Sequence, residues 1–112
     1  MPVGISPSAA HKIVHPDAEL GVARAAKQAG TVMVVSMPSS TPIEEVVAAA
    51  SPDAVVWAQL YIRKDRSLSV QDALRAKRCG CAAIVFTLDS PVTSRDPALG
   101  GSNFTPNPFS KT

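Results

Sequence analysis

Two pairs of polar residues stand at the ends of apolar segments of this sequence. Gln59 and Tyr61 end one segment, and Thr87 and Asp89 end another. Side chains alternate between the two faces of a β-strand, so the members of each pair point to the same face. An amide donates and accepts hydrogen bonds at once, and a carboxylate can orient a base. Each pair therefore predicts one wall of a pocket.

Four short apolar runs must hold these residues in place. They are β-branched or aromatic enough to form strands, and they do not alternate with polar residues. Such continuous apolarity indicates strands covered on both faces, as in a parallel sheet flanked by helices. The predicted strands are residues 3–5, 32–35, 55–60 and 82–88.

The first predicted helix covers residues 18–29. Asp17 can cap its amino end, and Gly30 offers a left-handed stop at its carboxyl end. The apolar face of this helix is expected at Val22, Ala26 and Ala29.

The second predicted helix begins after Thr41. Pro42 suits the first helical position, and Glu44 stands three residues after Thr41. A threonine at the cap and a glutamate at the third helical position are typical of a capping box.

The third predicted helix starts near Ser69, has Asp72 in its first turn and ends before Gly80. Positive charge in its last turn suits the negative end of the helix dipole. The basic residues there are Arg75, Lys77 and Arg78. The inward face is expected at Val70, Ala73 and Leu74.

Strands that alternate with helices predict an α/β fold made of βα units. Eight such units close a (β/α)₈ TIM-type barrel of about 250 residues. A chain of 112 residues supplies the first four units, a half barrel whose two edge strands are unpaired. Residues 92–112 are rich in Pro, Gly, Ser and Asn, which predicts a loop-like or disordered tail.

Composition excludes several classes of protein. The net charge is +2 and charged residues make up 18% of the chain, which shows no bias toward nucleic acid. No run of about 18 apolar residues could span a bilayer and no secretory signal begins the chain, so an intracellular protein is expected. Cys79 and Cys81 are too few for a zinc site and are expected to be plain thiols, and no metal is predicted.

Four stretches of the sequence carry a resemblance to a known family. They are residues 2–9, residues 43–46, the QLYIRKDR segment at 59–66 and the TLDSP segment at 87–91. In this order and spacing the chain resembles the FMN-dependent 2-hydroxy-acid oxidases and dehydrogenases, which include glycolate oxidase, lactate oxidase and flavocytochrome-type lactate dehydrogenases. The resemblance makes residues 1–91 a partial FMN-binding barrel and residues 92–112 a tail.

The resemblance implies FMN as cofactor and assigns residues to it. The loop at Ser8 and Ala9 is expected to lay main-chain groups against the flavin ring. The side chains of Ser36, Gln59 and Thr87 are expected to hydrogen-bond to the isoalloxazine and the ribityl chain. An amide suits the polar edge of that ring because it both donates and accepts.

The resemblance also assigns catalytic roles. Tyr61 is expected to contact the substrate carboxylate and hydroxyl, and Asp89 to pair with the histidine that acts as base. The family carries that histidine, a lysine and an arginine in the second half of its barrel. A further substrate-binding arginine of the family corresponds to Asp96 here, so Arg95, one position away, is the candidate to replace it. Pro38 replaces an aromatic residue of the family.

Simpler roles compete with these assignments. Gln59 and Tyr61 can be a buried polar pair that satisfies the main chain, and Asp89 can cap a turn before Pro91. The two histidines, His11 and His15, do not match the position of the family's base, and solvated or capping roles suffice for them.

Three functions are therefore in competition. The leading hypothesis is a member or fragment of an FMN-dependent enzyme that oxidises a 2-hydroxy-acid substrate to a 2-oxo acid. The rival is a non-catalytic truncated chain that at most binds flavin or self-associates as a homo-oligomer, pairing half barrels through open sheet edges. A phosphate-binding barrel with an unrelated substrate is the third. No partner in the form of nucleic acid or membrane is expected.

Overall fold

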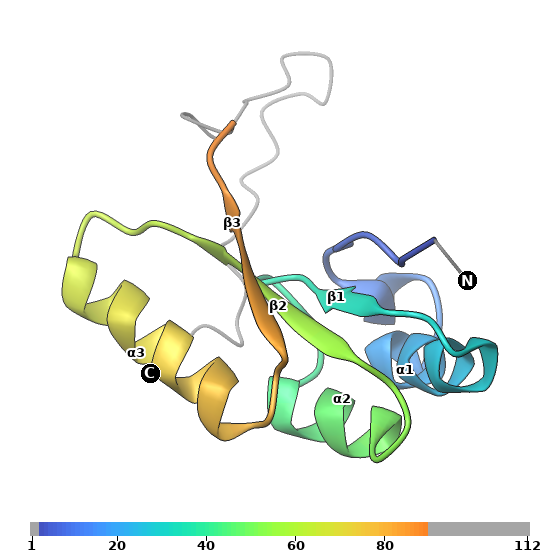
Figure 1. Cartoon of the computed structure of the whole chain (residues 1–112). Helices are drawn as coiled ribbons and strands as arrows, with labels where there is room; N and C mark the ends of the chain where they lie inside the picture. Colours follow the sequence, from blue (N-terminus) through green and yellow to red (C-terminus); the bar gives the residue numbers. More distant parts are fainter. Residues whose placement is uncertain (1–2, 90–112) are drawn as a thin grey trace, which may run out of the picture.

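A parallel sheet of three strands forms the frame of the protein (Figure 1). The computed structural model describes residues 3–89, so the predicted tail at 92–112 lies outside the described residues. The strands β1 (Met33–Val35), β2 (Val56–Tyr61) and β3 (Ala83–Thr87) lie in the order β1-β2-β3, and both pairings are parallel. The predicted parallel α/β architecture is confirmed.

Helices α2 and α3 connect these strands, η1 and α1 precede β1, and the helices lie on one side of the sheet (Figure 1). They are η1 (His11–Ile13), α1 (Ala18–Ala29), α2 (Ile43–Ala50) and α3 (Arg66–Arg78). Right-handed crossovers between neighbouring parallel strands place successive helices on the same face. The expectation that both faces are covered is wrong for residues 3–89, because Trp57 and Tyr61, on the face of β2 opposite to the buried Ala58, are 36% and 37% exposed.

The first predicted strand, at residues 3–5, forms only one bridge. Ile5 pairs in parallel with Met33 as an isolated bridge, with the Ile5 N–H donating to the Val32 carbonyl at 2.9 Å. The run has three residues, and Pro7 follows it without an N–H to extend a ladder. The described sheet therefore has three strands and a bridge in place of the four predicted strands.

Helix α1 has its predicted bounds, a different cap, and a buried face that agrees with the prediction at Ala26 and at Val22, which is partly buried against the core. The Asp17 side chain makes no capping hydrogen bond and instead accepts from the Arg24 guanidinium. Ala26 is buried as predicted, while Ala29 is exposed and Ala23 is buried in its place. Positions 19, 23 and 26 share one helix face, because residues three and four apart are neighbours on a helix.

The predicted capping box of α2 is wrong. Pro42 occupies the cap position, and no side chain caps the helix. The Thr41 hydroxyl donates to the Glu19 carboxylate at 2.8 Å, and the Glu44 carboxylate accepts from Arg75 of α3 at 2.7 and 2.8 Å. Both residues thus bind partners from distant parts of the chain, which replace the local capping bonds.

Helix α3 begins three residues earlier than predicted. Asp65 caps it, because its carboxylate accepts the Ser67 N–H at 2.9 Å. The expected inward face is wrong within the described residues, since Val70 is 57% exposed and Leu74 is also exposed, while Ala76 is buried. The basic residues do lie in the last turn, as predicted: Arg75, Lys77 and Arg78.

The core lies between the sheet and the helices α1 and α2. Its buried residues come from α1, β1, α2 and β2: Ala23, Ala26, Met33, Val35, Val46, Ala50 and Val56. No helix within residues 3–89 is both long and apolar enough to cross a membrane.

Glycine at the end of α1 gives a stability prediction. Gly30 has a φ of 62°, whereas a Cβ added there would meet nothing within 4 Å. Gly30→Ala should therefore lower the free energy of unfolding by about 1 kcal/mol through backbone strain alone. Gly21→Ala, inside α1, should leave it unchanged or raise it by up to about 1 kcal/mol because alanine is the better helix former. Urea unfolding of both variants measures the change in the free energy of unfolding. An equal change in the two variants would contradict the left-handed conformation assigned to Gly30.

Candidate functional site

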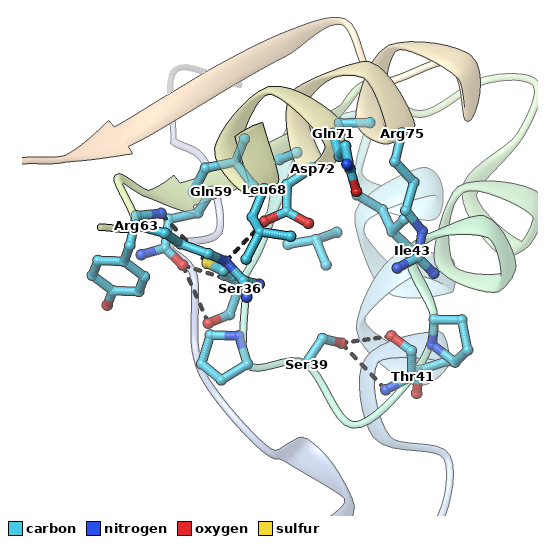
Figure 2. A pocket seen from close by; sticks show the side chains of 18 of the residues that line it. Ser36, Ser39, Thr41, Ile43, Gln59, Arg63, Leu68, Gln71, Asp72 and Arg75 are labelled. Atoms are coloured by element: carbon cyan, nitrogen blue, oxygen red, sulfur yellow. Dashed lines mark hydrogen bonds and ion pairs between the residues drawn. The ribbon is translucent and has the colours of Figure 1, made fainter. Parts of the chain in front are cut away.

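Three polar side chains meet where the strands end, and Gln59 is at their centre. Its Oε1 accepts from the Ser36 hydroxyl at 3.3 Å and from the Met37 N–H at 3.0 Å. Its Nε2 donates to the Thr87 hydroxyl at 2.8 Å. Figure 2 shows Gln59 and Ser36 joined in this way. The structure thus brings together the side chains of all three residues that the sequence assigned to the flavin ring and ribityl chain.

The orientation of the Gln59 amide follows from one main-chain group. The Met37 N–H can only donate, so it must face the amide oxygen, and the amide nitrogen then faces Thr87. The Ser36 hydroxyl and the Met37 N–H occupy both acceptor positions of Oε1, whereas only one of the two Nε2 hydrogens is donated, to Thr87. Counting partners within residues 3–89, the amide therefore offers a ligand one N–H donor and no acceptor. The expectation that it meets a ligand as both donor and acceptor is narrowed to a donor.

The parallel register places Tyr61 next to this group. Tyr61 is paired with Thr87 across β2 and β3, so the two side chains share one face of the sheet. Tyr61 is 37% exposed, and its N–H lies 3.5 Å from the Met37 sulfur. Gln59, by contrast, is 4% exposed. This face therefore has an accessible phenol beside a buried amide.

Of the other predicted site residues, the structure describes Ser8, Ala9 and Asp89. Ser8 and Ala9 are exposed in the loop before η1, and Ala10 of that loop donates its N–H to the Pro38 carbonyl at 3.2 Å. Asp89 is exposed two residues after the end of β3. Arg95 lies outside the described residues, as does Asp96.

A buried carboxylate organises the same loops, and the sequence analysis missed it. Glu19 of α1 is 1% exposed. Its carboxylate accepts from the Ser40 N–H at 2.8 Å, the Thr41 hydroxyl at 2.8 Å and the His11 N–H at 3.2 Å. The available signal was a lone acidic residue on the helix face that also holds Ala23 and Ala26.

Burial and hydrogen bonding have opposite effects on the pKa of the Glu19 carboxyl. Burial raises the pKa of its carboxyl, but the hydrogen bonds from Ser40, Thr41 and His11 outweigh this and hold the pKa at about 2. The carboxylate also lies in the first turn of α1, where the helix dipole favours negative charge. Glu19 is therefore ionised across the physiological range of pH.

A cavity of about 650 Å³ lies between α3 and the loop that follows β1. Figure 2 shows it with Ser39 and Thr41 on one side and Leu68, Asp72 and Arg75 on the other. Its lining includes Gln59, but the ion pair of Arg63 with Asp72, at 3.1 Å, also borders it. Most of the lining comes from α3 and the loop after β1, but Ser36, Gln59 and Tyr61 also line it, so the cavity adjoins the candidate site.

The thiols and imidazoles do not form a second site within residues 3–89. Cys79 and Cys81 are unpaired, and burial raises the pKa of both thiols, that of Cys81 to about 11. No three metal-binding side chains gather among the residues described. His15 accepts the Asp17 N–H at 3.1 Å, and His11 contributes its main-chain N–H to Glu19.

Sequence comparison groups the chain with flavoenzymes. Residues 1–109 match the profile of the family described as FMN-dependent dehydrogenase. Glycolate oxidase 5 of Oryza sativa subsp. japonica is 41% identical over 109 residues, which cover 97% of this chain and 29% of that protein. Glycolate oxidase of Spinacia oleracea is 39% identical over 109 residues, with the same coverage. The chain spans less than a third of the length of these curated relatives.

Solved structures agree with the sequence match. A mandelate oxidase variant with (S)-mandelic acid is similar with a TM-score of 0.82 and 37% identity, over 89% of this chain and 30% of that one. A variant of flavocytochrome b2 with pyruvate bound has a TM-score of 0.76 and 29% identity, over 81% of this chain and 24% of that one. The predicted relation to TIM-barrel flavoenzymes is confirmed.

The low pKa of Glu19 predicts an acid-sensitive stability. The group has a pKa of about 2 in the folded protein against 4.5 for a free glutamate, so its contribution is present above about pH 4.5 and is lost as the pH falls toward 2. This contribution is on the order of 3 kcal/mol at neutral pH. Glu19→Gln should remove that part of the pH dependence, as urea unfolding between about pH 6 and about pH 2 would measure.

Glu44 supplies the control for this prediction. Its pKa is also held at about 2, chiefly by the hydrogen bond from Arg75, but both side chains of this pair are about half exposed. Solvent and salt screen such a pair. Glu44→Gln should therefore change the pH dependence of the free energy of unfolding less than Glu19→Gln does, and high salt should abolish this change. An equal salt sensitivity of the Glu19 effect would contradict its burial.

Proposed function

The chain belongs to the FMN-dependent dehydrogenase family, whose cofactor is FMN, and we propose that it forms the flavin-facing wall of an enzyme that oxidises a 2-hydroxy acid to a 2-oxo acid. Residues 1–91 are proposed to provide this wall. Similarity to glycolate oxidases and to a mandelate oxidase supports the substrate class.

The single observation that carries the proposal is the uncommitted N–H of Gln59. Ser36, Met37 and Thr87 fix the amide, so its remaining hydrogen has a set direction before any ligand arrives. A flavin ring carries carbonyl oxygens and ring nitrogens along one edge, and these accept such a hydrogen bond. The Thr87 hydroxyl accepts from Gln59 and so keeps its own proton to donate. Two donors from neighbouring strands thus suit the polar edge of FMN.

Each remaining site residue has a role that its position supports. When bound, FMN accepts the two electrons that leave the 2-hydroxy acid. The exposed Tyr61 hydroxyl, on the face shared with Thr87, binds the carboxylate and hydroxyl of the substrate. Ser8 and Ala9 place main-chain groups against the ring from the loop that Ala10 ties to Pro38. Asp89 orients and stabilises the protonated base.

The base itself must come from beyond this set of residues. His11 and His15 lie in the loop before α1, where their described contacts are with Glu19 and Asp17. Arg95 is proposed to neutralise the substrate carboxylate in place of the family arginine, whose position Asp96 occupies. The chain by itself is therefore proposed to bind FMN and to turn over substrate poorly.

The rival function, self-association through an open sheet edge, is supported by a different observation. Ile84 and Phe86 of β3 are 37% and 47% exposed, and they share a face with Ala58 and Leu60, which are buried. Apolar side chains on an edge strand favour pairing with further strands. Gel filtration with light scattering tests this: a dimer that Phe86→Lys converts to a monomer supports it, and a monomeric native chain contradicts it.

Flavin titration of the full chain tests the proposed function. The native chain should quench the fluorescence of added FMN, and Gln59→Glu should weaken FMN binding about tenfold or more. The carboxylate can still accept from Ser36, Met37 and a reoriented Thr87 hydroxyl, so the fold persists while the spare donor is lost. Thr87→Ser, which keeps the hydroxyl, should bind FMN within about threefold of the native chain.

The outcomes separate the parts of this proposal. No FMN binding by the native chain would remove the flavin wall altogether, whereas unchanged binding by Gln59→Glu would remove only the role of the amide. Adding glycolate, lactate or mandelate without oxygen should leave the bound flavin oxidised. Rapid bleaching by one of them would contradict the claim that the chain lacks its base.

A further inference from the structure

The carboxylate of Glu19 joins two loops that come from different βα units. His11 belongs to the loop between the Ile5 bridge and α1, and Ser40 and Thr41 belong to the loop between β1 and α2. All three donate to the one carboxylate. A buried charge is costly unless it is fully hydrogen-bonded, and here three donors satisfy it. These three hydrogen bonds are directional, and the charge on the carboxylate makes each stronger than a bond between neutral groups.

Two further bonds show that these loops form one unit around the carboxylate. The Ala10 N–H donates to the Pro38 carbonyl at 3.2 Å, and the Lys12 N–H donates to the Ser40 hydroxyl at 3.1 Å. The first loop carries Ser8 and Ala9, and the second begins at Ser36 and Met37, which hold the Gln59 amide. Glu19 thus lies behind both segments that are proposed to face the flavin.

Two residues next to these contacts have a strained backbone, Ala10 just before η1 and Ala18 at the start of α1. Ala10 has a φ of 52° and Ala18 has a φ of 47°, in the left-handed region that alanine rarely adopts. Such conformations persist where surrounding contacts overdetermine them. Ala18 immediately precedes Glu19, and Ala10 immediately precedes His11, which is bound to the Glu19 carboxylate. The hydrogen bond from His11 to Glu19 therefore helps to hold the segment between Ala10 and Ala18 in its strained conformation.

We propose that Glu19 is a positioning residue that fixes the two flavin-facing loops relative to each other and so sets the affinity for FMN. This inference rests on the proposed function, because it assumes that the loops contact FMN. Glu19 itself is buried behind the loops and acts through them.

Three variants and a stability control test the role. Glu19→Gln keeps all three contacts, because its oxygen accepts the His11 and Ser40 N–H groups and its amide donates to the Thr41 hydroxyl. Glu19→Met has a similar length but leaves both N–H groups without an acceptor. Thr41→Val removes one contact. Val56→Ala, at the amino end of β2 away from the loops, destabilises the core and leaves the loop contacts intact.

The measurements are FMN affinity, the visible circular dichroism of bound FMN, and amide hydrogen exchange at His11 and Ser40 without FMN. Glu19→Met should lose FMN affinity about tenfold or more, with faster exchange at both amides and an altered flavin spectrum. Glu19→Gln should stay within about threefold of the native chain. Val56→Ala should keep native affinity and spectrum although it is less stable.

Each outcome decides the inference. Native FMN affinity in a folded Glu19→Met variant would overturn it, as would an equal loss in Val56→Ala. If the native chain binds no FMN, the proposed function fails, and unchanged exchange at His11 and Ser40 in Glu19→Met would then overturn the positioning role separately. If Glu19→Met does not fold, Thr41→Val decides: a loss of about threefold or more in affinity supports the role, and native affinity overturns it.

Discussion

The parallel alignment of β1, β2 and β3 is the constraint on which the candidate site depends. Parallel strands end at the same edge of a sheet, so residues far apart in the chain meet there. Ser36 directly follows β1, Gln59 lies in β2, and Thr87 ends β3. Their three side chains form one hydrogen-bonded group, and a shift of one residue in β2 would turn Gln59 to the opposite face. Register therefore decides both the core and the site.

Hydrogen-bond demand then fixes the chemistry that this edge can offer. The Met37 N–H requires an acceptor, and Gln59 provides it, which leaves a single amide hydrogen for a ligand. Behind the same loops, the Glu19 carboxylate satisfies two more main-chain donors and one hydroxyl. Buried polar groups of this kind are stable only when paired. The surface proposed to face the ligand is thus ordered by hydrogen bonds within the protein itself.

Packing is uneven around this framework. Helices cover one side of the described sheet, and the core involves β1, β2, α1 and α2 much more than β3 (Figure 1). Helix α3 joins α2 through the Glu44–Arg75 pair, which solvent screens. Helix α3 and strand β3 accordingly keep exposed apolar residues, for example Val70 and Phe86.

The sequence by itself determined the parallel α/β class and the bounds of α1, because apolar runs and helix boundaries are encoded in short stretches. Ser36, Gln59 and Thr87 were grouped through the resemblance to the flavoenzyme family. Tertiary structure decided the hydrogen-bond partners that local sequence patterns predicted wrongly. Thr41 and Glu44 fit a capping box, but partners on α1 and α3 bind them instead. Glu19 gave no motif, since its three donors lie 8 to 22 residues away along the chain. Long-range contacts of that kind exist only once the loops have been brought together.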